Sequence, residues 1–73
     1  MKEVSRRTAI ARLRYNCTKE EEILHMSRSI AEENEFGECY ITEARNNTIV
    51  NNGSLEEVMR DRKLLRDNEV IKD

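Results

Sequence analysis

Only two glycines, Gly37 and Gly53, interrupt this chain, and it contains no proline. Glycine and proline are the residues that most often mark turns and the ends of helices and strands. The two glycines are therefore the natural boundaries, and they divide the chain into residues 1–36, 38–52 and 54–73. Regular secondary structure is expected inside each of these three segments.

Apolar and mostly polar residues alternate near the start of the first segment. The apolar positions are Ala9, Ala11, Leu13, Tyr15 and Cys17. A period of two is typical of a strand with one buried face, so the pattern predicts a strand over about residues 9–17. A helix that places Ile10, Leu13 and Cys17 on one face is the alternative reading.

A helix is expected to follow this strand. Thr18 and Glu21 have the spacing of a capping box, in which each side chain bonds the backbone amide of the other. Ile23, Met26 and Ile30 follow at helical spacing. These signals predict a helix over about residues 19–34.

The middle segment, "ECYITEARNNTIVNN", supports two structures. Its β-branched and aromatic residues favour a hairpin, with Asn46 and Asn47 in the turn. Its spacing favours a helix over about residues 38–51, with one apolar face. That face would comprise Tyr40, Ile41, Ala44, Thr48 and Ile49. The segment by itself does not decide between the two.

The last segment carries a second capping box, formed by Ser54 and Glu57. An apolar stripe at helical spacing follows it: Leu55, Val58, Met59 and Leu65. We therefore predict a helix over about residues 55–66, packed on the core of the protein, and a short tail to residue 73.

Charge is distributed unevenly along the chain, although the net charge is only -2. Residues 1–19 carry six cations and one anion, whereas residues 20–43 carry one cation and eight anions. A basic amino-terminal segment on an acidic protein indicates a site for an anionic partner.

The chain is short for a stable monomer, because 73 residues with 37% apolar composition bury a small core. We therefore expect a homodimer. Cys17 and Cys39 occupy apolar positions and are expected to be buried thiols, with a disulfide between them as the alternative. Two cysteines and one histidine argue against a metal site. No apolar run is long enough for a signal peptide or a membrane span, so an intracellular protein is expected.

Taken in order, the segments resemble the ribbon-helix-helix DNA-binding family. The resemblance covers roughly residues 8–50 and rests on the basic strand, the helix ending in "SIAEEN", the turn "EFG" and the segment "ECYITEA". It implies a mainly α-helical homodimer with one short strand per chain, in residues 1–53, extended by the third helix. The two strands would pair as an antiparallel ribbon that enters the major groove of double-stranded DNA.

The resemblance also implies roles for individual residues. The residues expected to contact DNA are Arg7, Arg12, Arg14, Asn16 and Thr18, together with Gly37, whose amide would face a phosphate. The residues expected in the dimer core are Leu13, Tyr15, Cys17, Ile23, Met26, Ile30, Tyr40, Ile41, Ala44 and Ile49.

The expected function is sequence-specific DNA binding in transcription regulation. No nucleophile motif, glycine-rich phosphate loop or metal-ligand spacing is present in the sequence, so no enzymatic activity, cofactor or small-molecule substrate is expected. His25 is expected to be a surface or interface residue. The sequence resembles small heat-stable proteins encoded by viruses of archaea, which implies the host cytoplasm or nucleoid. The alternative function is a protein-binding inhibitor or adaptor of βαββα fold, which would bind a basic protein through its glutamate-rich helix.

Overall fold

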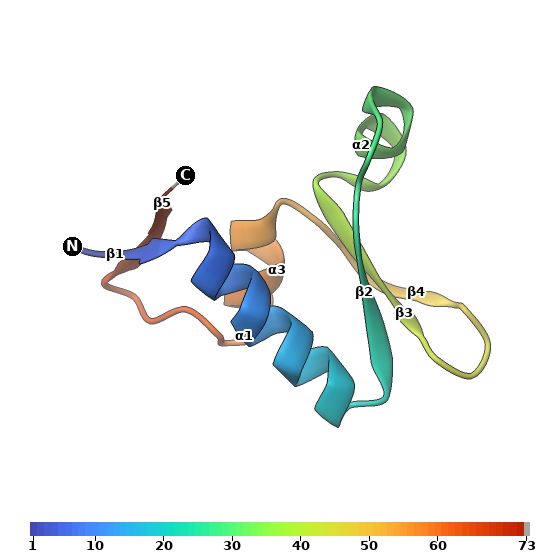
Figure 1. Cartoon of the computed structure of the whole chain (residues 1–73), viewed down its shortest axis with the longest axis horizontal. Helices are drawn as coiled ribbons and strands as arrows, with labels where there is room; N and C mark the ends of the chain where they lie inside the picture. Colours follow the sequence, from blue (N-terminus) through green and yellow to red (C-terminus); the bar gives the residue numbers. More distant parts are fainter. Residues whose placement is uncertain (73) are drawn as a thin grey trace.

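The computed structural model describes residues 1–72, which form three helices and five strands (Figure 1). In chain order these are β1 (Lys2–Ser5), α1 (Arg6–Lys19), β2 (Glu22–Met26), α2 (Ile30–Phe36), β3 (Cys39–Glu43), β4 (Ile49–Gly53), α3 (Leu55–Asp61) and β5 (Glu69–Lys72). Strands β2, β3 and β4 form an antiparallel sheet in that order, and β1 pairs with β5 in parallel. The predicted class, a mainly α-helical ribbon-helix-helix fold with one strand, is therefore wrong.

The predicted strand over residues 9–17 is part of helix α1. Ser5 caps this helix by accepting a hydrogen bond from the Thr8 amide at 3.1 Å. Ala9, Leu13 and Cys17 are buried, and their spacing of four residues fits a helical face as well as alternation. The two patterns differ at Ala11 and Tyr15, and both of these side chains are exposed. Helical packing therefore accounts for the burial, and the strand interpretation does not.

The predicted helix over residues 19–34 is also wrong. The chain turns at Glu21, which has a φ of 58°, and then forms β2 and the short helix α2. The Thr18 hydroxyl donates to the Arg14 carbonyl at 3.0 Å, inside α1, and so does not cap a new helix. The cap of α2 is Ser29, whose hydroxyl accepts from the Glu32 amide.

Residues 39–53 form the hairpin β3–β4, so the predicted helix over residues 38–51 is wrong and the hairpin alternative is confirmed. The turn contains Asn46 and Asn47, as that alternative predicted. Asn47 has a φ of 57°, a conformation that asparagine adopts more readily than most residues. The Asn46 side chain accepts a hydrogen bond from the Thr48 amide at 3.2 Å.

The Ser54 cap is confirmed, because its hydroxyl accepts from the Glu57 amide at 3.1 Å. Helix α3 ends at Asp61, earlier than the predicted residue 66, and the expected tail contains strand β5. The predicted apolar stripe is confirmed as buried, and it consists of Leu55, Val58, Met59 and Leu65.

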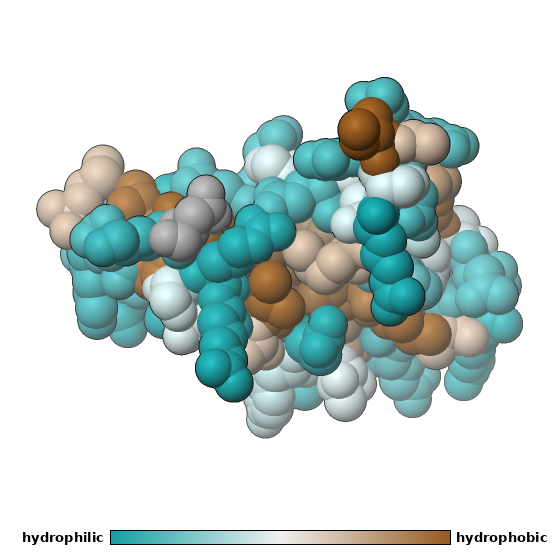
Figure 2. Space-filling view, turned by 45° about the horizontal axis from the view of Figure 1, so that its top comes forward, coloured by the Kyte–Doolittle hydropathy of each residue, from teal (hydrophilic) through white to brown (hydrophobic). Residues whose placement is uncertain are grey.

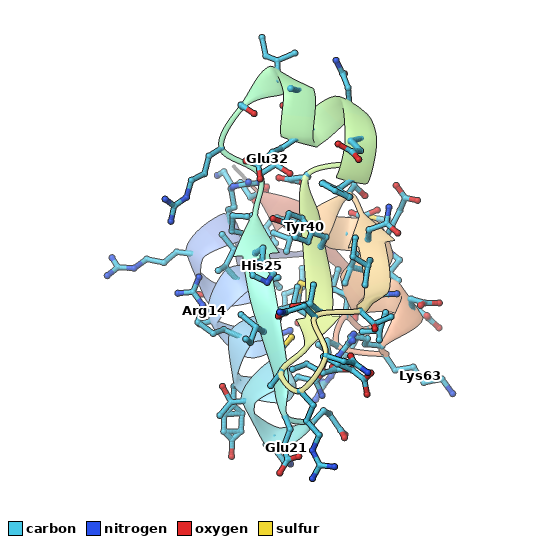
Figure 3. The ribbon with its side chains drawn as sticks, turned by 90° about the vertical axis from the view of Figure 1, so that its right-hand side faces the viewer. Arg14, Glu21, His25, Glu32, Tyr40 and Lys63 are labelled. Atoms are coloured by element: carbon cyan, nitrogen blue, oxygen red, sulfur yellow. The ribbon has the colours of Figure 1, made fainter. Side chains whose placement is uncertain are left out.

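The core lies between the three-stranded sheet and the helices α1 and α3, which pack side by side on one face of the sheet (Figure 1). Its side chains include Leu13 from α1, Ile41 from β3 and Met59 from α3, each with no exposed area. Cys17 and Cys39 are buried free thiols, and burial raises the pKa of Cys39 to about 11. Within residues 1–72 no helix crosses the strands on the other face of the sheet, which we call the open face, and α2 lies at one end of it (Figure 3).

Candidate nucleic-acid interface

Helix α1 has an unusual charge composition. Its sequence, "RRTAIARLRYNCTK", contains five cations and no acidic residue. Because Ala9, Leu13 and Cys17 face the core, helical geometry turns Arg7, Arg14 and neighbouring side chains outward. The resulting surface, which we call the α1 face, is a shallow hollow lined by Arg6, Arg7, Ile10, Ala11, Arg14, Tyr15 and Thr18.

Two of the five cations of α1 are held by carboxylates of other elements. Arg6 pairs with Glu38, which also accepts a hydrogen bond from the Leu55 amide at 2.8 Å. Burial acts to raise the pKa of Glu38, but the Leu55 amide and the Arg6 guanidinium outweigh it and hold the pKa below its usual value. This carboxylate therefore joins the start of α1 to the start of α3.

Arg12 is the second engaged cation. Its guanidinium donates to both carboxylate oxygens of Glu69, at 3.1 and 3.4 Å, and to the Leu64 carbonyl at 3.2 Å. Glu69 is 3% exposed and also accepts from the Arg66 amide at 2.9 Å. These contacts anchor β5 to α1, so Arg12 has a structural role.

The remaining cations of α1 are available to a ligand. Within residues 1–72, Arg7 and Arg14 form no ion pair, and Lys19 lies over the Tyr15 ring at 5.7 Å from its centroid. The space-filling view shows small hydrophobic patches set between long hydrophilic side chains (Figure 2). On the α1 face, Arg7 and Arg14 lie together with the apolar side chains of Ile10 and Ala11.

The residues predicted to contact DNA do not all lie together. Arg7, Arg14 and Thr18 are exposed on the α1 face. Arg12 is engaged by Glu69, and the Asn16 side chain accepts from Arg62 at 2.9 Å. Gly37 lies in the turn between α2 and β3, where its amide, which was expected to face a phosphate, donates to the Glu33 carbonyl at 2.9 Å.

The predicted dimer core is distributed over the whole molecule. Leu13, Cys17 and Ile41 are buried in the core of the single chain, and Met26 and Tyr40 are half-buried. The remaining five are exposed: Tyr15, Ile23, Ile30, Ala44 and Ile49. Tyr15, which is 65% exposed, is the residue of the α1 face that the strand interpretation turned inward. Tyr15 follows Ala11 by four residues, so in a helix the two lie on the same outward side as Arg7 and Thr18. This spacing is the sequence signal that indicates an exposed Tyr15.

A second group of aromatic side chains lies on the open face of the sheet. His25 stacks on Tyr40 with ring centroids 4.7 Å apart, and the tilted Phe36 ring contacts Tyr40 at the same centroid distance. The His25 ring shares a 2.9 Å hydrogen bond with the Thr42 hydroxyl. Partial burial and the neighbouring Glu32 raise the pKa of Tyr40, whose hydroxyl donates to Glu32 at 3.4 Å (Figure 3). His25 is thus a structural residue of this face.

The Glu69 contacts predict how stability depends on pH. The Arg12 side chain and the Arg66 amide hold the folded-state pKa of Glu69 below its ordinary value of 4.5. The corresponding stabilisation is fully present above that value and is lost as the pH falls below it. We expect the urea midpoint to fall on acidification below about pH 4.5, and Glu69→Gln to be less stable at pH 7 but less sensitive to acid. Circular dichroism at pH 7, 5, 4 and 3 measures the urea midpoints. An equal fall in the midpoints of the wild type and of Glu69→Gln on acidification would contradict the prediction.

Within residues 1–72 no cluster of histidine, cysteine or carboxylate side chains has the grouping of a metal site. None of the helices in that range has the length and apolar character needed to cross a membrane. Comparison with protein-family models, with curated proteins and with solved structures finds no match to this chain.

Proposed function

We propose that this protein binds double-stranded DNA through the α1 face. The observation that carries the proposal is that Arg7, Arg14 and Thr18 line one exposed surface of a helix that contains no acidic residue. An anionic backbone is attracted to such a surface even though the whole protein is slightly acidic.

The geometry of α1 suits the major groove of DNA. A single α-helix fits the width of that groove, and α1 spans 14 residues, or about 21 Å. Arg7 and Arg14 are two turns apart, about 10 Å along the axis, so they can contact the groove at two levels. Arginine donates to guanine edges or to phosphates, and the Thr18 hydroxyl can accept a hydrogen bond. The helix thus takes the place of the β-ribbon.

A second candidate function is protein binding. Its support is the hairpin β3–β4, which the adaptor interpretation required. The predicted means of binding, a continuous glutamate-rich helix over residues 19–34, is excluded because this segment forms β2 and α2. A protein partner would therefore need another surface.

We test DNA binding by fluorescence anisotropy of a labelled 20-base-pair duplex between 50 and 200 mM salt. If Arg7, Arg14 and Lys19 each neutralise one phosphate, the salt slope, which is the slope of the logarithm of the binding constant against the logarithm of the salt concentration, is about -2.7. The affinity then falls roughly 40-fold over this range. The double variant Arg7→Ala, Arg14→Ala retains one contact, so its slope is expected to be about -0.9.

The matched control is Arg45→Ala, Arg66→Ala, which makes the same change in net charge at exposed positions outside the α1 face. This control should keep the wild-type slope. Absence of binding at 50 mM salt, or an equal loss of binding in both double variants, would refute DNA binding by the α1 face.

A further inference from the structure

Strand β2 has a free edge. It pairs with β3 on one side, and no strand within residues 1–72 pairs with its other side. The Ala44 amide donates to the Glu21 carbonyl and the Ser27 amide donates to the Glu38 carbonyl, at the two ends of the β2–β3 register. Bonded positions alternate along an antiparallel pair. Ile23 and His25 therefore bond β3, and the backbone groups of Leu24 and Met26 point away from the sheet.

This edge differs from the other edge of the sheet, which is formed by β4. The β3–β4 register is interrupted by an irregularity at Ile41 and Thr42, and the Asn51 side chain of β4 donates to Asp61 at 3.0 Å. Bulges of this kind hinder the addition of another strand. The register of β2 is continuous over five residues, so β2 is the edge better suited to accept a strand.

A cleft runs along the β2 edge, between α1 and the start of α2. Leu24 and Met26 lie in this cleft, and Arg14 and Arg28 contribute its positive charge. Among residues 1–72, Glu32 is the one carboxylate that lines the cleft. Both of its oxygens are engaged, by the Arg28 amide at 3.0 Å and by the Tyr40 hydroxyl. Neither arginine side chain forms an ion pair within residues 1–72. Figure 3 shows Arg14 beside β2, on the side opposite to β3.

We propose that an extended, acidic peptide segment of a partner protein docks on the β2 edge as a fourth strand. Its backbone pairs with Leu24 and Met26, and its carboxylates pair with Arg14 and Arg28. This is β-strand addition, in which main-chain bonds supply affinity and alternate side chains supply specificity. A second copy of this chain is disfavoured as the occupant, because its own Arg14 and Arg28 would lie against the Arg14 and Arg28 of the first copy.

The proposal does not depend on DNA binding, although Arg14 borders both surfaces. The two can be separated by residues that belong to one surface only. Arg28 lines the β2 cleft and Arg7 lines the α1 face, and neither lines the other surface.

The first test measures backbone protection with a defined probe. The probe is a seven-residue acetylated peptide amide that alternates glutamate and valine, and its control replaces every glutamate with lysine. We expect the acidic peptide to slow amide hydrogen exchange of Leu24 and Met26 by about tenfold or more, and to leave Ile23 and His25 nearly unchanged because β3 already holds them. Nuclear magnetic resonance of the 15N-labelled protein gives the exchange rate of each amide.

The second test uses variants. Arg28→Ala is expected to weaken the acidic peptide about fivefold, as for a partly exposed ion pair, and to leave the DNA salt slope unchanged. Arg7→Ala should reduce the DNA salt slope and leave binding of the acidic peptide unchanged. Three results would overturn the proposal. The first is that the lysine peptide binds as tightly as the acidic peptide, and the second is that the acidic peptide binds without protecting the Leu24 and Met26 amides. The third is that protection of these amides rises with protein concentration when no peptide is present. The last result would identify a second copy as the occupant.

Discussion

Replacing Gly37 with alanine is expected to lower the free energy of unfolding by about 3 kcal/mol or more. Gly37 has a φ of 91°, a conformation that residues with a side chain rarely adopt. A Cβ atom at this position would lie 2.7 Å from the Gly53 Cα and 2.9 Å from its carbonyl carbon. Both clashes are with backbone, so relieving them requires the turn after α2 to move away from the end of β4. Urea unfolding followed by circular dichroism measures the loss.

Gly53→Ala is the matched control for this prediction. Gly53 has a φ of 140°, but the nearest atoms to its added Cβ belong to the Glu57 side chain, at 3.8 Å and beyond. This variant carries the conformational cost without the backbone clash, so we expect a loss of about 1 kcal/mol. Equal losses in the two variants would show that the close approach of Gly37 to Gly53 is not a constraint on this fold.

The second large effect is expected at Arg12. Arg12→Ala leaves the nearly buried Glu69 carboxylate without its guanidinium partner and frees the Leu64 carbonyl. Removing one partner of a largely buried charge pair is destabilising, and because the Arg12 side chain is 39% exposed we expect a melting temperature lower by roughly 10 °C. Differential scanning calorimetry measures this change.

Arg14→Ala is the control, because it removes the same side chain two residues along the same helix. Arg14 is exposed and forms no ion pair within residues 1–72, so its melting temperature should stay within about 2 °C of the wild type. The ribbon-helix-helix interpretation gave both arginines the same role, contact with DNA. Equal melting temperatures for the two variants would therefore contradict the contact between Arg12 and Glu69.

The sequence determined those features that depend on a few neighbouring residues. The Ser54 cap was predictable because its hydroxyl bonds an amide only three residues away. The hairpin turn at Asn46 and Asn47 was one of two open alternatives, and it rests on a conformational preference of asparagine itself. The burial of Leu13 and Cys17 was also predictable, because both interpretations of the segment place them on the apolar side, whereas only the alternating pattern included Ala9.

The tertiary structure decided which elements these buried residues belong to. A spacing of four residues satisfies both a strand and a helix, and only the packing of α1 on the sheet and on α3 selects the helix. That choice moved Tyr15 to the surface and separated Arg12 from Arg14. Their different partners could not be predicted, because the Glu69 carboxylate is 57 residues away from Arg12 in the sequence.

The three strands that the sequence did not reveal, β1, β2 and β5, show the same limit. In β2 the sequence "EILHM" lies within a stretch of apparent helical spacing, and it forms a strand because Leu24 pairs with Ile41 across the sheet. In β5 the sequence "EVIK" is only four residues long, and its partner β1 lies at the other end of the chain. Caps and turns are thus fixed by interactions within a few residues, whereas these strands form only when distant backbone groups meet.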